Sequence, residues 1–405
     1  MKPMPLEHAP SRMPPNVAML GLVSLLMAAS SQMTNSLLPV YLVTVMGAST
    51  ATVGLIEGLA EATNSCLRAV SGVISDWIGR RKPLVVFGYA LSACVKPVFP
   101  LAGSIPVILA ARLFDRSGKG IRDAPRDALL ADQLHSRVRG SGFGLRITLF
   151  TVGTVLGPML AAGIMAVSAH NFRLVFWVAV IPAALSVLVL VTRVREPPHF
   201  ASEPKSWLDW QSLTLLPSAY WWVVAVACII ALARFSQAFL LLKANAIGVG
   251  MAHVPAYLAL MGLVYGVSAY PFGILADCMD RRLQLGMGVV TLAMTHVVLA
   301  FADTGSVLIL GSLLWGLQLG MIDGLLGASV ADTAPPDLRG TGFGIFYLSV
   351  GSASLLASTM AGLLWGAGGA TLTFSIGAGL AMIALLCVVA ARSSFPAFTP
   401  HPATP

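Results

Sequence analysis

Charged side chains are scarce in this chain, because only 10% of its 405 residues are Asp, Glu, Lys or Arg, whereas 57% are hydrophobic. The stretches 174–191, 219–233 and 376–391 hold no charged residue at all. They approach the roughly 20 residues that a helix needs to cross a bilayer. So much apolar surface excludes a soluble fold of this length and indicates a membrane protein.

Cysteine is also scarce, and the five that occur are spread one to each predicted helix: Cys66, Cys94, Cys228, Cys278 and Cys387. No spacing suggests a disulfide framework or a zinc site, so we expect small packing residues and no bound metal or cofactor. The segment "SGKG" at 117–120 lacks the glycine and the Ser or Thr of a phosphate-binding loop. We find no nucleophile with an associated base, and we do not expect an enzyme.

The hydrophobic pattern predicts an all-α integral membrane protein with twelve transmembrane helices. The expected helices are 17–45, 51–75, 83–102, 106–133, 142–167, 172–192, 219–246, 253–278, 284–303, 306–333, 341–366 and 369–392. They divide into two six-helix bundles, 17–192 and 219–392. An N-terminal segment, 1–16, an interdomain loop, 193–218, and a tail, 393–405, complete the chain.

The basic residues of the short loops predict the orientation, because cytoplasmic loops carry an excess of Lys and Arg. With both termini in the cytoplasm, that side receives Arg80, Arg81, Lys82, Arg137, Arg139, Arg193, Arg195, Lys205, Arg281, Arg282 and Arg339. The net charge of +8 reflects this bias and makes anionic lipid the natural partner. We expect a bacterial inner membrane protein that acts as a monomer and does not bind nucleic acid.

The two halves repeat. "LLADQLHSRVRGSGFG" begins at Leu129 and "ASVADTAPPDLRGTGFG" begins at Ala328, so Asp132 and Asp332 fall 200 residues apart. The pairs Gly120 and Gly320, Asp123 and Asp323, Arg139 and Arg339, and Gly142 and Gly342 keep the same offset. Duplicated bundles are typical of transporters, in which two halves rock about a site between them.

A loop motif repeats with the bundles. "GVISDWIGRRK" at 72–82 resembles the loop between the second and third helices of the major facilitator superfamily, and "FGILADCMDRR" at 272–282 is its weaker second copy. The resemblance implies the twelve-helix facilitator fold and alternating access. It also implies a conformational latch of Gly72, Asp76, Gly79, Arg80, Asp277 and Arg281.

The fourth and fifth predicted helices extend this resemblance. Arg112, Gly118, Gly120 and Asp132 stand where the family has an intramembrane arginine, two glycines and an aspartate. "GTVLGPMLAA" at 153–162, with Gly153, Gly157 and Pro158, is similar to the antiporter signature of the family. It implies export in exchange for protons, although the glycines and proline also suit close helix packing.

Two charged stripes follow helical spacing. One lies at 106–133 and holds Arg112, Asp115, Arg116, Lys119, Arg122, Asp123, Arg126 and Asp127. The other lies at 51–75 and holds Glu57, Glu61, Asn64 and Arg68. Because each charge costs about 2.5 to 3.5 kcal/mol at a lipid-facing helix centre, we expect both stripes to face protein or water.

The second half has fewer interior polar groups. Arg234, Gln237 and Asp323 are candidates for the cavity, as are Gln32, Asn35 and Tyr41 of the first helix, Gln318, and Lys243 with Asn245. We interpret Glu57, Glu61, Asp115, Asp123 and Asp323 as proton-coupling candidates. The predicted substrate-binding residues are Asn35, Arg112, Arg116, Lys119, Arg122, Arg126, Arg234 and Gln237. Each could instead make ordinary buried ion pairs or interhelical hydrogen bonds.

The leading hypothesis is a proton-coupled secondary transporter that exports a small polar or anionic solute. Uptake of a polar nutrient by proton symport is the first alternative. A transport-silent membrane sensor or assembly partner is the second. A free transition-metal ion is disfavoured as substrate because His and Cys do not cluster on cavity helices.

Overall fold

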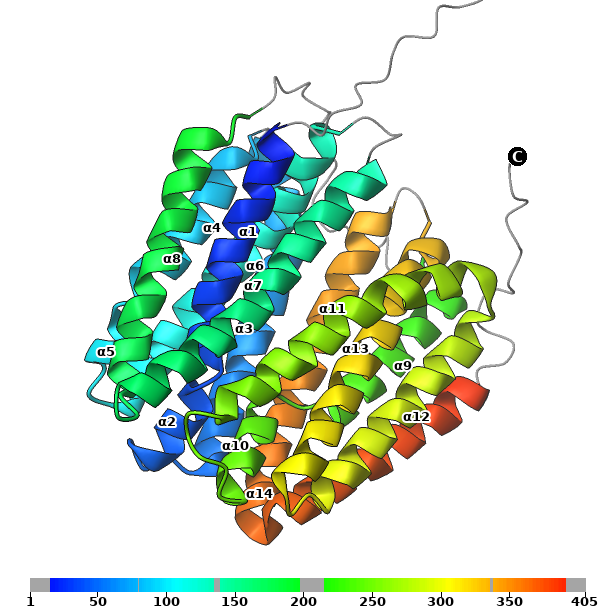
Figure 1. Cartoon of the computed structure of the whole chain (residues 1–405). Helices are drawn as coiled ribbons and strands as arrows, with labels where there is room; N and C mark the ends of the chain where they lie inside the picture. The colour runs from blue at the N-terminus through cyan, green and yellow to red at the C-terminus, as the bar shows by residue number, and fades with distance from the viewer. Residues whose placement is uncertain (1–14, 79, 135–138, 197–214, 336–337, 391–405) are drawn as a thin grey trace, which may run out of the picture.

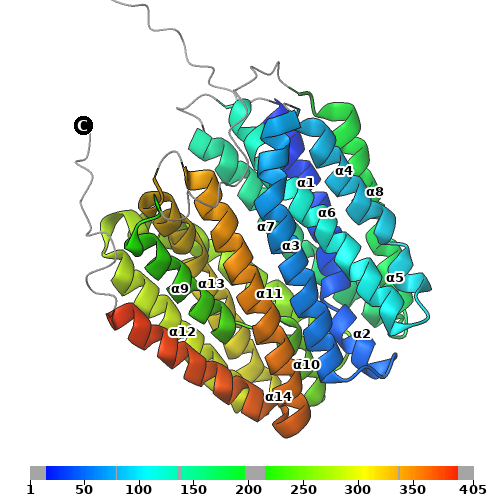
Figure 2. The ribbon, with the colours of Figure 1, turned by 180° about the vertical axis from the view of Figure 1, so that it is seen from behind.

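The computed structural model describes residues 15–78, 80–134, 139–196, 215–335 and 338–390. Within these ranges the chain is helical, without a strand, which confirms the all-α prediction. The predicted segments 1–16, 193–218 and 393–405 lie wholly or largely outside the described residues. The two bundles stand side by side, with α1 to α8 in one and α9 to α14 in the other (Figures 1 and 2).

The first bundle comprises α1 (Pro15–Asn35), α2 (Leu38–Thr44), α3 (Thr50–Ile78), α4 (Lys82–Val95), α5 (Val98–Leu101), α6 (Ile105–Asp132), α7 (Arg139–Val167) and α8 (Phe172–Arg193). The second comprises α9 (Ser218–Ala233), α10 (Ala238–Ala246), α11 (Val254–Cys278), α12 (Arg281–Ala300), α13 (Gly305–Thr333) and α14 (Arg339–Ala390). Pairs of short helices share a span, and α14 supplies two, which gives the predicted twelve spans.

The long helix α14 is two spans joined by a glycine turn. Gly368 and Gly369 leave the helical conformation, and Gly369 has φ +71°, which favours glycine because it has no Cβ. The helices predicted at 341–366 and 369–392 therefore meet with almost no loop between them.

Three of the predicted single helices are broken. The span at 17–45 divides before Pro39, and the span at 83–102 divides at Pro97, because proline has no N–H to donate and restricts the residue before it. The span at 219–246 is interrupted at 234–237, where Arg234 has a non-helical ψ of 72°. This last break faces the centre of the molecule.

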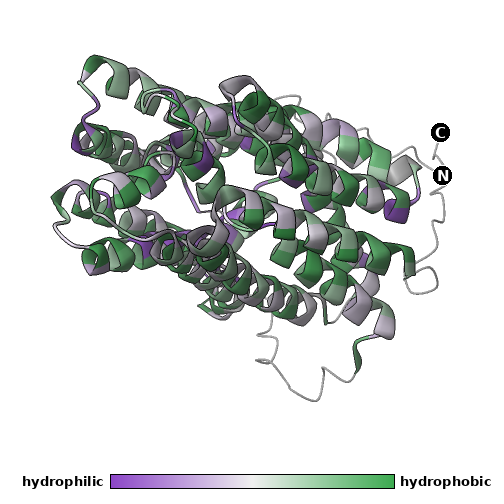
Figure 3. Ribbon diagram, turned by 90° about the horizontal axis from the view of Figure 1, so that it is seen from below, coloured by the Kyte–Doolittle hydropathy of each residue, from purple (hydrophilic) through white to green (hydrophobic). Residues whose placement is uncertain are grey.

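Among the described residues, nine helical stretches are long and apolar enough to span a membrane. Helices α3 and α6 are not among them, and these two carry the charged stripes. Hydrophobic residues cover much of the outer surface, and hydrophilic ones occur between the bundles (Figure 3). The charges of α3 and α6 are tolerated because α3 packs against α6 and α14 and not only against lipid.

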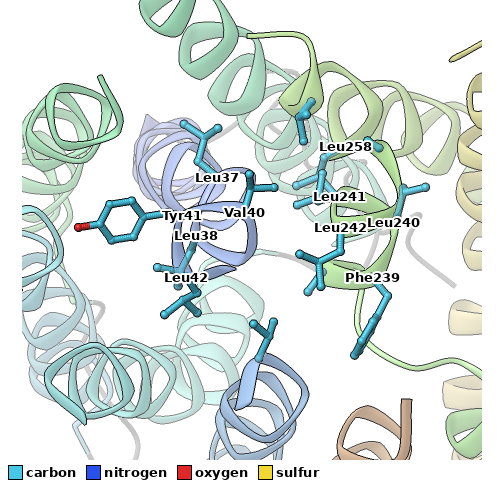
Figure 4. Close-up of a cluster of buried hydrophobic side chains, with 14 of the residues drawn as sticks. Leu37, Leu38, Val40, Tyr41, Leu42, Phe239, Leu240, Leu241, Leu242 and Leu258 are labelled. Atoms are coloured by element: carbon cyan, nitrogen blue, oxygen red, sulfur yellow. The ribbon is translucent and has the colours of Figure 1, made fainter. Parts of the chain in front are cut away.

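The bundles meet closely at the end formed by α2 and α10. One apolar cluster includes residues of both bundles there, among them Leu38 and Leu42 of α2 and Phe239 and Leu241 of α10 (Figure 4). A second cluster holds only residues of α9 to α14 and their flanks, and a third only residues of α1 to α8 and their flanks. The shared cluster therefore closes the end of the molecule opposite the start of α1.

Candidate functional site

A cavity of about 430 Å³ lies between the bundles. All the residues predicted for proton coupling or for substrate binding line it: Asn35, Glu57, Glu61, Arg112, Asp115, Arg116, Lys119, Arg122, Asp123, Arg126, Arg234, Gln237 and Asp323. Gln32 also lines the cavity, whereas Tyr41 packs against Phe172 and Phe176. The helical spacing of the stripes therefore located the cavity wall.

An ion pair joins the two charged stripes. The Arg112 guanidinium donates to Glu57 at 2.9 Å and also donates to Asn35 of α1. The hydroxyl of Ser236, in the break between α9 and α10, lies 3.4 Å from the same Glu57 carboxylate. Glu57 thus accepts hydrogen bonds from both bundles.

Asp115 has a partner that the stripe analysis did not identify. Lys96, at the end of α4 and only 1% exposed, lies 3.0 Å from its carboxylate and also donates to Ser31 at 3.3 Å. Lys96 was not among the predicted site residues. Its isolation in an otherwise apolar span was the signal for a buried acidic partner, because a buried charge needs one.

Further along α6, two cations are held by neighbouring groups. Arg126 donates to Asp123 and Asp127, each at 3.0 Å. Arg122 donates to Ser92 at 2.7 Å, and its guanidinium lies 4.4 Å from the centre of the Tyr89 ring. Both arginines are buried, so these contacts fix their positions in the wall.

The glycines of "SGKG" bring the neighbouring helices close to this stripe. A Cβ on Gly118 would lie 2.5 Å from the carbonyl oxygen of Gly88 on α4, and one on Gly120 would lie 2.6 Å from that of Asn64 on α3. Their function is close packing. The segment is therefore a packing surface on the back of the charged wall.

The second bundle contributes one ion pair to the cavity. Arg234, at the end of α9, donates to Asp323 of α13 at 2.7 Å. The break at 234–237 turns this arginine out of the regular helix. The candidates Lys243 and Gln318 are also buried, but neither lines the cavity.

Four charged groups of the cavity, Glu61, Arg116, Lys119 and Arg122, have no ion-pair partner within 4 Å among the described residues. Arg116 and Lys119 also make no hydrogen bond there, and the Nε of Arg116 is buried without an acceptor. Glu61 accepts a hydrogen bond from Asn64 at 3.1 Å. Two cations and one carboxylate are therefore available to a bound solute.

The structure describes only some of the residues of the predicted latch. Arg81, and not the exposed Arg80, pairs with Asp132 at 3.2 Å, and Arg281 pairs with Asp332 in the second copy. The backbone N–H groups of Arg81 and Lys82 donate to Glu196. Gly72 packs towards Ala124, Gly79 lies outside the described residues, and so do the side chains of Asp76 and Asp277.

The antiporter-like motif on α7 faces α1 within the same bundle. A Cβ on Gly157 would lie 2.5 Å from the carbonyl oxygen of Ala29, and one on Gly153 would lie even closer to that of Leu25. Pro158 is inside the helix. Close packing of α1 on α7 accounts for both glycines. The other face of α7 meets α11 across the bundle boundary, where Thr151 contacts Gly266.

Two six-helix bundles with a polar cavity between them are the architecture of a transporter of the facilitator type. The family model of the Major Facilitator Superfamily matches residues 20–263 and 239–404. This chain belongs to that superfamily and is a multi-pass membrane transporter.

Relatives match along nearly the whole chain. An uncharacterized MFS-type transporter of Methanocaldococcus jannaschii is 30% identical over 380 residues, 92% of this chain and 94% of the relative. The inner membrane transport protein YajR of Escherichia coli is 26% identical over 385 residues, 90% of this chain and 80% of the relative. The crystal structure of a POT family transporter with a thioalcohol-conjugated peptide has a TM-score of 0.78 at 11% identity, covering 93% and 96% of the chains.

Proposed function

We propose that this transporter moves a small polar or anionic solute by alternating access and couples that movement to protons. The observation that carries the proposal is the cavity between the bundles, where α3 and α6 present buried acidic and basic groups together. Buried ion pairs are poor stabilisers compared with apolar side chains. So many charges on two helices are better explained by transport than by folding.

The proposal includes the sidedness of the cycle. With both termini in the cytoplasm, as the basic loops predict, the shared apolar cluster closes the outer end in this conformation. The separate clusters of the two bundles lie towards the cytoplasmic side. The protein would then be facing inward, in a bacterial inner membrane, as a functional monomer.

Export in exchange for protons rests on the α7 motif, and Gly153 and Gly157 in that motif support close packing as well. Proton symport is the second candidate. The observation that favours it is the position of Glu61, whose charge is attracted by Arg112, Arg116 and Lys119. Protonating this carboxylate would free cations that an anionic solute can use.

The test uses purified protein in liposomes that enclose a pH-sensitive dye, with a pH gradient imposed across the membrane. We expect a member of a panel of small polar and anionic solutes to move protons in protein-containing vesicles and not in empty ones. The direction of proton movement relative to the solute separates exchange from symport. If no solute in the panel moved protons, the sensor or assembly-partner alternative would replace the proposal.

Variants test which carboxylates couple transport to protons. Glu61→Gln and Asp115→Asn remove the two carboxylates in turn, and Asp303→Asn is the matched control, because Asp303 is exposed and lies outside the cavity. We expect the control to retain the pH dependence of transport. If both cavity variants folded and also retained it, these carboxylates would have no part in coupling.

A further inference from the structure

The walls of the cavity differ in chemistry although the bundles repeat. Asp115 and Lys119 on α6 line the first wall, and the positions 200 residues later on α13, which also line the cavity, are Trp315 and Leu319. Phe235, Leu241 and Leu258 add to the second wall. A solute between the bundles therefore meets charge on one side and mostly apolar surface on the other.

The cations of the first wall are not equivalent. Arg112 and Arg126 have carboxylate partners, and Arg122 is held by Ser92 and Tyr89. Arg116 and Lys119 stand one helical turn apart and have no hydrogen bond or ion pair among the described residues. A cation without a partner in a membrane cavity is costly, and the Nε of Arg116 is buried, so these two half-buried side chains are the ones poised to receive an anion.

Glu61 is the carboxylate that faces these two cations. From α6, the charges that act on it are those of Lys119, Arg116 and Arg112. Its own helix carries Glu57 and Arg68. On α14, Tyr347 lies against Arg68 at 4.4 Å, and across the cavity Arg234 is paired with Asp323. Glu61, Arg116 and Lys119 thus line one cavity, and none of the three has an ion-pair partner among the described residues.

We infer that Arg116 and Lys119 bind the carboxylate of a small amphipathic organic anion, whose apolar body lies against Trp315 and Leu319 of the opposite wall. This inference rests on the proposed transport function and names the class of substrate. The Arg116 fork and the Lys119 ammonium supply charge-assisted hydrogen bonds, and the aromatic and aliphatic side chains remove the apolar body from water. The bound anion contacts both bundles.

Binding of this anion and protonation of Glu61 favour one another. When Glu61 is ionised it shares the attraction of the same two cations, and an anion placed beside it is repelled. When Glu61 is protonated, both cations are available to the anion. Anion affinity therefore rises as the pH falls, by up to about tenfold per pH unit for one coupled proton. Anion and proton occupy the cavity together.

The experiment measures binding to purified protein in lipid nanodiscs by thermal unfolding and by calorimetry. The probe is phenylacetate, which joins a carboxylate to an apolar ring. Phenylacetamide is its neutral counterpart, and succinate and inorganic phosphate are anions without an apolar body. We expect phenylacetate to raise the unfolding temperature and to bind more tightly than the other three. Equal binding of phenylacetate and phenylacetamide would overturn the inference, as would binding by none of the four.

Four variants locate the site. Arg116→Gln and Lys119→Gln should each weaken phenylacetate binding by at least about tenfold, since each removes a charged hydrogen bond. Leu319→Asn should weaken phenylacetate binding and spare phosphate. Arg173→Gln, which removes an exposed arginine outside the cavity, is the control and should bind normally. Wild-type affinity in folded Arg116→Gln and Lys119→Gln proteins would contradict the assignment.

Glu61→Gln tests the coupling to protons, because glutamine mimics the protonated acid. It should bind phenylacetate at least as tightly as the wild type, and its affinity should not rise as the pH falls, whereas that of the wild type should. A retained pH dependence would remove Glu61 from the coupling. The binding assays do not depend on transport. If phenylacetate bound normally but the protein moved no solute in liposomes, the proposed transport function would be refuted and the anion site would not.

Discussion

The guanidinium of Arg112 lies 2.9 Å from the carboxylate of Glu57, and this ion pair ties α6 to α3 beside the cavity. The Arg112 side chain is 3% exposed and that of Glu57 is 11% exposed, so neither charge can turn to bulk water. The same carboxylate accepts from Ser236 of the second bundle. One buried pair thereby takes part in folding and in the contact between bundles.

Replacing Arg112 by Gln should destabilise the protein strongly, by about 3 to 5 kcal/mol, because Glu57 is left as a buried charge without its partner. The measurement is denaturant unfolding of detergent-solubilised protein, with size-exclusion chromatography as the test of folding. The double variant Arg112→Gln with Glu57→Gln should lose less than the sum of the single losses. Additive losses would mean that the two side chains do not interact.

The ion pairs Arg81–Asp132 and Arg281–Asp332 should behave differently. The side chains of Arg81 and Asp132 are 16% and 32% exposed, so Arg81→Gln should cost less than about 1 kcal/mol of stability, as partly exposed pairs do. Arg281→Gln should do the same in the second copy. We expect both variants to change the rate of transport in liposomes far more than the unfolding temperature. A large fall in that temperature would mark the pairs as structural supports.

The glycines of α7 provide a packing test with a control on the same helix. Gly157→Ala places a methyl group 2.5 Å from the Ala29 carbonyl oxygen, so α1 and α7 must separate at a cost of about 1 to 3 kcal/mol. Gly163→Ala meets nothing within 4 Å and should be neutral or slightly stabilising. The measurement is the unfolding temperature of each variant, which should be lower for Gly157→Ala than for Gly163→Ala. Equal unfolding temperatures would argue against close packing at Gly157.

A cross-link at the closed end should stop the cycle. A Cβ on Gly366 would lie 3.9 Å from the Thr50 hydroxyl, within adjustment of disulfide geometry. In a background with every native cysteine replaced, Thr50→Cys with Gly366→Cys should block transport after oxidation and recover with reductant. Each single variant serves as the control. Full activity of the cross-linked protein would show that this end need not open.

Much of the fold and the wall of the cavity was predictable from the sequence, because both depend on periodicity. The charges from Arg112 to Arg126 recur every three or four residues in an apolar context, and a stripe of that kind has to face protein or water. The repeat at an offset of 200 residues placed Asp323 beside the same cavity. Both inferences need only the geometry of a helix.

The individual partners were less predictable, because pairing depends on how helices rotate about their axes. Sequence spacing did not identify the partner of Asp115, which the structure shows to be Lys96 of α4. Sequence spacing also did not identify the pair of Arg81 with Asp132. A shift of one residue turns a side chain by about 100° around a helix, which sequence spacing alone does not resolve.

The apolar layer of α2 and α10 has a kinetic consequence. Opening the bundles at that end would hydrate side chains such as Leu38, Leu42, Phe239 and Leu241, each of which contributes about 1.5 to 3 kcal/mol when fully buried. On the proposed alternating-access cycle, we expect an empty protein to cross to the opposite conformation slowly, and we expect a ligand that contacts both bundles to lower this barrier by keeping them together. Exchange of labelled solute across the membrane should accordingly be faster than net movement in one direction.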